Sequence, residues 1–312
     1  MTAKPRQVWL PTQFTSLADL PAGLRYARWD GLSAFPSDPA EVEFYVAPLV
    51  QDIGTISRPL PRMTRLKAVQ ALSSGTDELR AELRRLPGHV TLCNAQGVHA
   101  RSTAELALTL ILASLRGLPE FIHAQDLGVW KPNVFPSLYE RSVLVVGYGA
   151  IGSALEDLLV PFGCAVTRVA RDDRDSPRGP VHSVSRLPRL VAEADVVVLA
   201  TPLTPATRQL FDADLLARMK DGALLVNVSR GAVVDTTALL EEAHSGRLLA
   251  ALDVTDPAPL TAGHPLWAAP GVLITPHVGA FTPSLWRRLE ELIRRQLKRF
   301  AAGEELDNIV SP

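Results

Sequence analysis

Three residues that could carry out proton transfer follow three successive apolar segments in the second half of the chain. Arg230 follows LLVNVS, Asp256 follows ALDVT, and His277 follows VLITP. Histidine exchanges a proton near neutral pH, a carboxylate can orient its ring, and arginine can bind a carboxylate through two hydrogen bonds. Each residue alone has an ordinary explanation as a loop charge, a turn residue or a structural histidine. Together they form a set that can hold an acidic substrate and transfer a proton to it.

The apolar segments that precede these residues have the composition of buried strands. Strands are predicted at residues 165–170, 195–200, 223–228, 248–254 and 272–275, with helical or polar stretches between them. This alternation predicts a doubly wound parallel sheet. Ligands bind such sheets beyond the carboxyl ends of the strands, which is where the three residues are expected.

A glycine-rich turn predicts what this sheet binds. The apolar run 143–146 leads into Gly147, Gly149 and Gly152, and apolar spacing typical of a helix begins at Ala150-Ile151. In this pattern the first glycine forms a tight turn, the second admits a pyrophosphate, and the third lets the helix pack on the strand. The N–H groups at the start of the helix bind phosphate. The strand before the turn and the helix after it favour a dinucleotide site over a turn of purely structural origin.

The composition argues against several other classes of function. The chain carries 32 basic and 33 acidic residues, and a formal net charge of −1 favours neither a nucleic-acid nor a membrane surface. Its two cysteines, Cys93 and Cys164, are too few for a disulfide framework. The longest apolar run, 106–115, is shorter than a bilayer span, and the first residues lack the apolar core of a signal peptide. We therefore expect a cytoplasmic protein with a small-molecule ligand and no metal site.

The motifs around the predicted sheet resemble those of the D-2-hydroxyacid dehydrogenase family. In chain order they are VVGYGAIG, ATPLTPATRQLF, LLVNVSRGAVVD, ALDVTDPAPL, HPLW and TPHVGA, with a weaker match at Ser74-Gly75-Thr76-Asp77 and Asn94. The resemblance implies an enzyme that transfers hydride between NAD(P)H and a small 2-oxo acid, as glyoxylate/hydroxypyruvate reductases and phosphoglycerate dehydrogenases do. The alternative is a dinucleotide-sensing protein that has the same fold but no turnover.

The resemblance also implies a role for each candidate residue. Arg230 resembles the arginine that binds substrate and polarises its carbonyl, and His277 resembles the acid/base histidine. The partner of that histidine is usually glutamate in the family, whereas this chain has Asp256, which is one methylene shorter. Ser74 and Gly75 resemble the loop that binds the substrate carboxylate. The predicted cofactor-binding residues are Gly147, Gly149, Ala150, Ile151, Gly152, Arg171, Arg174, Thr201, Pro202 and Asp253.

The length of the chain, 312 residues, favours two domains. Before the predicted nucleotide sheet, short strands are expected at residues 7–10, 25–29, 42–46, 66–72 and 90–93, with a helix at 77–86. A final amphipathic helix, 283–301, should return to this smaller unit. The predicted fold is therefore α/β with two Rossmann-like domains. A doubly wound nucleotide domain, residues 99–282, is inserted into a smaller flavodoxin-like substrate domain made of residues 1–98 and 283–312.

The end of the second strand of the nucleotide sheet predicts which cofactor is used. An acidic residue about 20 positions beyond the glycine turn normally bonds the ribose 2′-hydroxyl of NAD. Here the predicted strand ends at Ala170, and Arg-Asp-Asp-Arg follows at 171–174. Because arginine suits a 2′-phosphate, we expect NADP(H) to be favoured, with NAD(H) possible if one of the aspartates reaches the ribose. The plain alternative is a solvated turn in which Arg171 pairs with a neighbouring aspartate.

Two segments between the domains predict an assembly. The helix expected at 102–116 is apolar on more than one face, and the irregular segment 125–139 contains the aromatic residue Trp130. Such surfaces need a partner, so we expect a two-fold homodimer. The resemblance implies the same, because family members are commonly dimers. The alternative is an arm folded on its own subunit.

Overall fold

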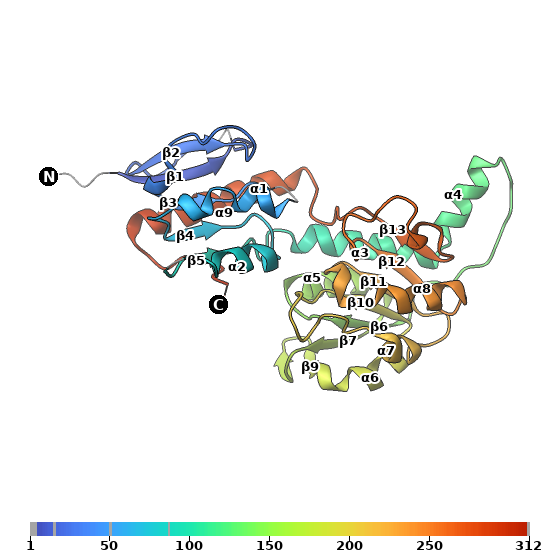
Figure 1. Cartoon of the computed structure of the whole chain (residues 1–312). Helices are drawn as coiled ribbons and strands as arrows, with labels where there is room; N and C mark the ends of the chain where they lie inside the picture. The colour runs from blue at the N-terminus through green and yellow to red at the C-terminus, as the bar shows by residue number, and fades with distance from the viewer. Residues whose placement is uncertain (1–4, 15–16, 50–51, 87, 311–312) are drawn as a thin grey trace. The chain divides into compact units, whose positions relative to one another are not determined.

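The computed structural model describes residues 5–14, 17–49, 52–86 and 88–310. The chain divides into two compact units (Figure 1). Unit 1 consists of Met1–His99 and Thr282–Pro312, and unit 2 consists of Ala100–Phe281. Unit 2 is therefore inserted between the two segments that form unit 1.

Unit 1 contains a parallel sheet with the strand order β2-β1-β3-β4-β5. This order, with the first strand between the second and third, is that of flavodoxin-like doubly wound folds. The strands are β1 (Arg6–Pro11), β2 (Leu24–Trp29), β3 (Val42–Val46), β4 (Ala68–Gln70) and β5 (Thr91–Cys93). The α-helices are α1 (Ile53–Ser57), α2 (Asp77–Leu83) and α9 (Ser284–Ala302), and short 3₁₀ turns occupy Pro39–Glu41 and Leu60–Arg62.

Helix α9 is the part of unit 1 that comes from beyond unit 2. Its apolar side chains recur every three or four residues, and this stripe packs against residues of β1 and β3, including Val8 and Phe44. The helix ends at Gly303, whose φ of 72° is the left-handed conformation that commonly terminates helices. The buried stripe consists of Leu285, Leu289, Leu292, Ile293, Leu297 and Phe300.

A buried amide network ties α9 to the sheet of unit 1. The fully buried Gln296 donates to Gln70 Oε1 of β4 at 2.7 Å and to the Asp307 carbonyl at 2.9 Å. Its own Oε1 accepts from the Asp307 N–H at 2.8 Å. Buried polar groups of this kind are costly when they lose a partner, so the network fixes the position of α9.

Unit 2 contains an eight-stranded sheet with the order β13-β12-β11-β10-β6-β7-β9-β8. All neighbours are parallel except β8 and β9, which form an antiparallel pair. The order reverses between β6 and β10, which makes the gap beyond their carboxyl ends the expected ligand site. The strands are β6 (Ser142–Val146), β7 (Ala165–Ala170), β8 (Arg174–Ser176), β9 (Gly179–Ser183), β10 (Val196–Leu199), β11 (Leu224–Asn227), β12 (Leu249–Leu252) and β13 (Val272–Ile274).

Apolar cores cover both faces of the unit 2 sheet. Along β6, Val143 and Val145 belong to one buried cluster, whereas Leu144 and Val146 belong to the other. A strand buried on both faces has the continuous apolar sequence seen here. The helices are α3 (Ala100–Leu115), α4 (Leu118–Asp126), α5 (Ala150–Leu159), α6 (Leu187–Leu190), α7 (Ala213–Ala217) and α8 (Thr236–His244). Short 3₁₀ turns occupy Val160–Phe162, Val184–Arg186, Val191–Glu193, Gly231–Val233 and Pro265–Ala268.

The predicted fold class is confirmed, but the sequence analysis does not predict the hairpin of β8 and β9 or helices α1 and α4. The sequence predicts no hairpin where β8 and β9 lie, because β8 has only three residues and carries no apolar alternation. Helix α4 was not predicted because its apolar side chains are exposed and no buried stripe marks it. Figure 1 shows α4 and the segment after it projecting from unit 2.

In the described ranges, no single helix is long and apolar enough to cross a bilayer. Only α3 and α4 taken together pass that test, and they are bent by 66° where they meet.

Replacing Gln296 with leucine should destabilise unit 1. The change leaves Gln70 Oε1 and the Asp307 N–H without their partner, at a cost of roughly 1–3 kcal/mol for each buried group. Lys298→Leu, at an exposed position of the same helix, should change the free energy of unfolding by less than about 0.5 kcal/mol. Urea unfolding followed by tryptophan fluorescence measures the difference, because the buried Trp9 and Trp29 both report on unit 1. Equal midpoints for the two variants would show that the network contributes nothing.

Candidate active site

The first glycine of the turn after β6 lies at the point where the strand order reverses. The N–H groups of Gly147 and Tyr148 both donate to the Val169 carbonyl of β7 at 2.9 Å. Gly147 has a φ of +99°, and a Cβ added there would lie 2.5 Å from the carbonyl carbon of Ala200, beyond β10. Only glycine fits this position, since both the dihedral and the close approach exclude a side chain.

The other two glycines have the complementary properties that a dinucleotide site needs. A Cβ added at Gly149 would meet nothing within 4 Å, so the backbone there is open to a ligand. One added at Gly152 would lie 2.9 Å from Val145 Cγ1, because α5 packs closely on β6. Helix α5 begins at Ala150 and Ile151, whose N–H groups bond to no described residue. The turn therefore presents free donors beside an open space, which fits a pyrophosphate.

The loop after β10 supplies a further polar group beside this turn. Thr201 Oγ1 is buried and has no hydrogen-bond partner among the described residues. Buried polar atoms without a partner are uncommon, and a bound ligand is one way to satisfy them. Pro202 is exposed, and its carbonyl accepts from Thr207 Oγ1 at 2.6 Å. The predicted Thr201-Pro202 segment thus lies against Gly147, whose added Cβ would be 2.6 Å from the Thr201 nitrogen.

The end of β7 carries no acidic side chain. Ala170 is its last residue, and Arg171, which follows, is exposed. Asp173 is engaged elsewhere, because its Oδ1 accepts from the Ser183 N–H at 3.1 Å and lies 3.2 Å from Arg186 Nη2. The hairpin thus occupies one of the two aspartates that could have reached a ribose.

Arg174, the other predicted arginine, donates from Nη2 to the Tyr148 carbonyl at 2.6 Å. This bond ties the β8–β9 hairpin to the glycine turn. Arg174 is therefore committed in part to positioning the turn.

A buried charge network beneath the turn was missed by sequence reasoning. The Tyr148 hydroxyl donates to Glu156 of α5 at 2.6 Å, and Arg168 Nε of β7 donates to the same carboxylate at 2.8 Å. Burial acts to raise the pKa of Glu156, but the hydrogen bonds from Arg168 and Tyr148 outweigh it and hold the pKa below its usual value. The sequence signal that could have revealed this network is Arg168, a charged residue inside the apolar strand β7.

The loop after β11 positions Arg230. Asn227 is buried, and its Oδ1 accepts from the Ser229 N–H at 3.0 Å and from the Ser229 hydroxyl at 2.7 Å. Asn227 Nδ2 donates to the Arg230 carbonyl at 3.0 Å. A Cβ added at Gly231 would lie 2.0 Å from the carbonyl carbon of Thr255. The loops that follow β11 and β12 are therefore in direct backbone contact, and glycine is required between them.

Asp253, just beyond β12, holds the loop that carries His277. Its side chain is 3% exposed and accepts from Thr275 Oγ1 at 2.7 Å, the Val278 N–H at 2.9 Å and the Gly279 N–H at 3.0 Å. The Asp253 carbonyl accepts from the His277 N–H at 2.8 Å. Three of the roughly four acceptor positions of this carboxylate are thus occupied within unit 2, which leaves about one for the predicted contact with a cofactor.

His277 lies beyond β13 in the left-handed conformation, with a φ of 55°. Shielding of its ring from water lowers the pKa of His277, and the positive charge of Arg230 lowers it further. The negative charge of Asp253 acts in the opposite direction. The structure therefore brings Arg230 and His277 together, within electrostatic reach of each other.

Asp256, the predicted partner of His277, is not among the described groups that shift the pKa of that histidine. Its side chain is exposed, and no described residue hydrogen-bonds to its carboxylate. Only its carbonyl is engaged, by Thr236 Oγ1 at 2.9 Å. The acidic residue whose charge raises the pKa of His277 is Asp253, which lies at the end of the strand rather than in the loop after it.

In unit 1, Ser74 and Gly75 follow the carboxyl end of β4. Ser74 is held by Asn94 Nδ2, which donates to its carbonyl at 2.9 Å, and Ser73 Oγ donates to the Gly75 carbonyl at 2.7 Å. The N–H groups of Ser74 and Gly75 donate to no described residue. Two free main-chain donors at the end of a parallel strand are suited to a carboxylate.

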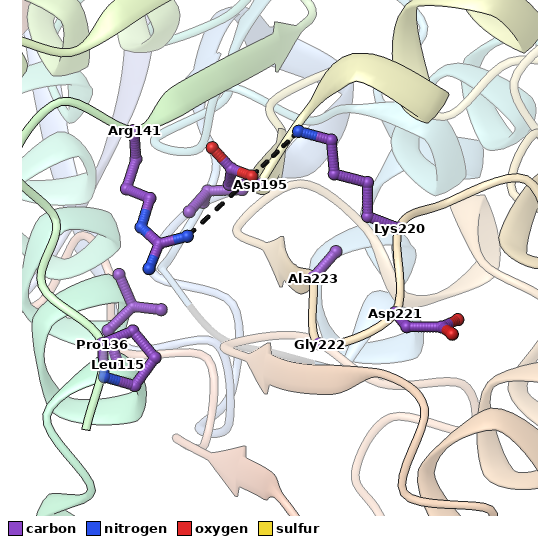
Figure 2. Close-up of a pocket in the computed structure, with 9 residues that line it drawn as sticks. Leu115, Pro136, Arg141, Asp195, Lys220, Asp221, Gly222 and Ala223 are labelled. Carbon is purple, nitrogen blue, oxygen red and sulfur yellow. Dashed lines mark hydrogen bonds and ion pairs between the residues drawn. The ribbon is translucent and has the colours of Figure 1, made fainter. Parts of the chain in front are cut away.

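A pocket at the opposite edge of the unit 2 sheet has a different character. Figure 2 shows the side chains of Arg141 and Lys220 directed toward Asp195. Asp195 Oδ1 lies 4.0 Å from Arg141 Nη1 and 2.9 Å from Lys220 Nζ. Burial acts to raise the pKa of Asp195, but bonds from Ser142 and Lys220 outweigh it and lower the pKa to about 2. This ion cluster joins the amino ends of β6 and β10, away from the glycine turn, and we assign it a structural role.

Comparison with known proteins identifies the family. The sequence model of the D-isomer specific 2-hydroxyacid dehydrogenase NAD-binding domain matches residues 108–279. Human glyoxylate reductase/hydroxypyruvate reductase is 33% identical over 249 residues, which are 77% of this chain and 76% of the human protein. Glyoxylate reductase of Thermococcus kodakarensis is 32% identical over 258 residues, covering 79% of this chain and 77% of that enzyme.

The fold comparison agrees. A D-isomer specific 2-hydroxyacid dehydrogenase from Xanthobacter autotrophicus Py2, solved in complex with NADPH and MES, superposes with a TM-score of 0.83. It is 30% identical, and the match covers 99% of both chains. With the glycine turn, Arg230 and His277 all at the carboxyl edge of one parallel sheet, this chain belongs to the D-isomer specific 2-hydroxyacid dehydrogenases, a family of NAD(P)-dependent oxidoreductases.

Proposed function

We propose that this protein reduces a small 2-oxo acid to the D-2-hydroxy acid, with a preference for NADPH. The observation that carries the proposal is that Arg230 and His277 follow strands β11 and β13 at the edge of the sheet that carries the glycine turn, near enough for the charge of Arg230 to lower the pKa of His277. Relatives named as glyoxylate and hydroxypyruvate reductases support substrates of this size. No feature of the described residues favours the alternative of a dinucleotide sensor without turnover.

The glycine turn and its neighbours would hold the cofactor. The open backbone at Gly149 and the free N–H groups of Ala150 and Ile151 suit the pyrophosphate, and Thr201 Oγ1 would gain the partner it lacks. The cofactor supplies the hydride, and the protein supplies the proton and the binding of charge.

Arg230 and His277 would work in sequence on the substrate. In the free protein the charge of Arg230 opposes protonation of the His277 ring. A substrate carboxylate bound by Arg230 offsets that charge, so a proton on His277 becomes more favourable when substrate is present. The imidazolium would then transfer its proton to the carbonyl oxygen during the reduction, which leaves the His277 ring neutral. In unit 1, the N–H groups of Ser74 and Gly75 stay the predicted donors to a carboxylate.

The arginines after β7 support the NADP(H) preference. The position expected for a ribose-binding acid is occupied by Ala170. The carboxylate of Asp173 is engaged by an ion pair with Arg186 and a hydrogen bond from the Ser183 N–H. The exposed Arg171 would bind the 2′-phosphate. Arg174 would help to position the glycine turn through its bond to the Tyr148 carbonyl.

The assembly proposed for this protein is a two-fold homodimer. Residues 118–134, which we call the arm, expose Leu127 by 64%, Trp130 by 97% and Val134 by 95%. So many apolar side chains on one projecting segment are unusual for a monomer. A second copy of the chain is the partner we propose.

A cytoplasmic location and the absence of nucleic-acid and membrane partners stay predictions from the sequence. The location rests on the two cysteines, which are too few for a disulfide framework, and the partner predictions rest on the balanced charge of 32 basic and 33 acidic residues.

Removing the proton donor tests the function directly. His277→Gln should lower kcat for glyoxylate or hydroxypyruvate reduction by about 10²–10⁴-fold, because general-acid catalysis contributes that much. NADPH affinity, measured by fluorescence titration, should stay near that of the unmodified protein. His244→Gln, at an exposed position on α8, is the matched control. Undiminished turnover in the His277 variant, or no turnover by the unmodified protein on a broad 2-oxo acid panel, would contradict the proposal.

The cofactor preference is tested with both nucleotides. The unmodified protein should have the higher kcat/KM with NADPH, and Arg171→Ala should raise KM for NADPH by roughly tenfold or more, since a charge-assisted bond contributes about 1.5–3 kcal/mol. KM for NADH should hardly change. Arg189→Ala removes another exposed arginine from the same unit and serves as control. A preference for NADH in the unmodified protein would show that Arg171 reads no phosphate.

The homodimer is tested by light scattering after size-exclusion chromatography. The unmodified protein should have twice the chain mass at micromolar concentration, and the double change Trp130→Ser with Val134→Ser should weaken the dimer by removing two exposed anchors. Leu32→Ser removes a 76% exposed leucine of unit 1 and should leave the mass unchanged. A monomeric unmodified protein would end the idea.

A further inference from the structure

We propose that Asp253, and not Asp256, is the acidic residue that positions His277 and favours the charged form of its ring. The inference rests on the proposed role of His277 as proton donor. It assigns the partner of the histidine to a buried carboxylate at the end of a strand, where the sequence pattern had placed it in the loop beyond.

The hydrogen bonds of Asp253 surround His277 along the chain. Its carboxylate accepts from Thr275, two residues before His277, and from Val278 and Gly279, one and two residues after it. Its carbonyl accepts from the His277 N–H itself. Four bonds from one residue therefore fix the whole turn that presents the imidazole.

The turn needs this support because of its conformation. A φ of 55° is uncommon for a residue other than glycine, and such conformations persist where surrounding bonds impose them. Bonds on both sides of His277 supply that restraint.

Close packing shows that the carboxylate belongs in this place. A Cβ added at Gly279 would lie 3.0 Å from Asp253 Oδ2 and 3.4 Å from Thr103 Cγ2 of α3. The absence of a side chain at Gly279 is what lets the buried oxygen reach the main chain. The bond between the Asp253 carboxylate and the Gly279 N–H therefore depends on glycine at position 279.

The charges around His277 favour the same assignment. The groups that act on the ring are Arg230, beyond β11, and Asp253, beyond β12. Asp253 is buried, so water screens its charge poorly, and it opposes Arg230. Asp256, in the loop after β12, is exposed, and its charge is not among those that shift the ring.

The test is the pH dependence of a single turnover of bound NADPH with glyoxylate. Reduction needs protonated His277, so the rate falls as pH rises through the pKa of that residue. Asp253→Asn keeps the size of the side chain and removes its charge, and should move this fall to lower pH by roughly one unit or more. Asp256→Asn should leave the fall where it is in the unmodified protein. If Asp253 had only a structural role, Asp253→Asn would lower the rate but the rate would still fall at the same pH.

Two further measurements keep the test decisive if Asp253→Asn does not fold. The first is an NMR titration of the His277 ring in the Asp256→Asn protein, which should give the same pKa as the unmodified protein. The second is Thr275→Val, which removes one donor to Asp253 and keeps its charge, and should lower the single-turnover rate while NADPH affinity is retained.

The inference would be overturned if Asp256→Asn shifted either the pH at which the rate falls or the pKa of the His277 ring. It would also be overturned if folded Asp253→Asn kept the pH of the fall unchanged, or if Thr275→Val kept the rate unchanged. If His277→Gln itself turns over normally, the proposed function fails instead.

Discussion

The site depends on how closely main chains approach one another at the carboxyl edge of the unit 2 sheet. Three glycines mark close contacts there. Gly147 and Gly231 lie against the main chains of Ala200 and Thr255, and Gly279 lies against the carboxylate of Asp253. In each case an added Cβ would lie 3.0 Å or less from the neighbour. Loops packed this tightly have few alternative positions, so the side chains they carry are held before any ligand arrives.

Preorganisation of this kind matters most for charge. The charges of Arg230 and Asp253 act in opposite directions on the pKa of His277. Asn227 holds the Arg230 main chain within its own loop, and the Asp253 carboxylate is held by the loop that carries His277. Because protein dipoles and charges replace mobile water there, small displacements would change the balance. The network of Tyr148, Glu156 and Arg168 does similar work beneath the glycine turn, where three elements meet.

Much of this was predictable because it is local in the sequence. The strands of both sheets are apolar runs, and the glycine turn is a short pattern with a strand before it and a helix after it. Arg230 and His277 could be predicted as site residues because each follows such a run directly. The sequence could not show that Asp253 bonds to residues 22–26 positions later, or that Asp256 faces solvent. Those facts depend on how loops fold back on one another. The β8–β9 hairpin was missed for a related reason, because Arg174 and Asp173 are ordered by contacts with distant residues.

The insertion of unit 2 into unit 1 sets the order in which the protein can fold as it leaves the ribosome. Helix α9 is synthesised after every residue of unit 2, yet it covers Val8 and Phe44 and completes the amide pair with Gln70. Until α9 emerges, that apolar face of the first sheet has no covering helix. Unit 2, whose residues are contiguous, can close its own core before then. The nascent chain thus holds a finished nucleotide-binding unit tethered to an unfinished sheet, and the exposed face of that sheet is where a chaperone would be needed.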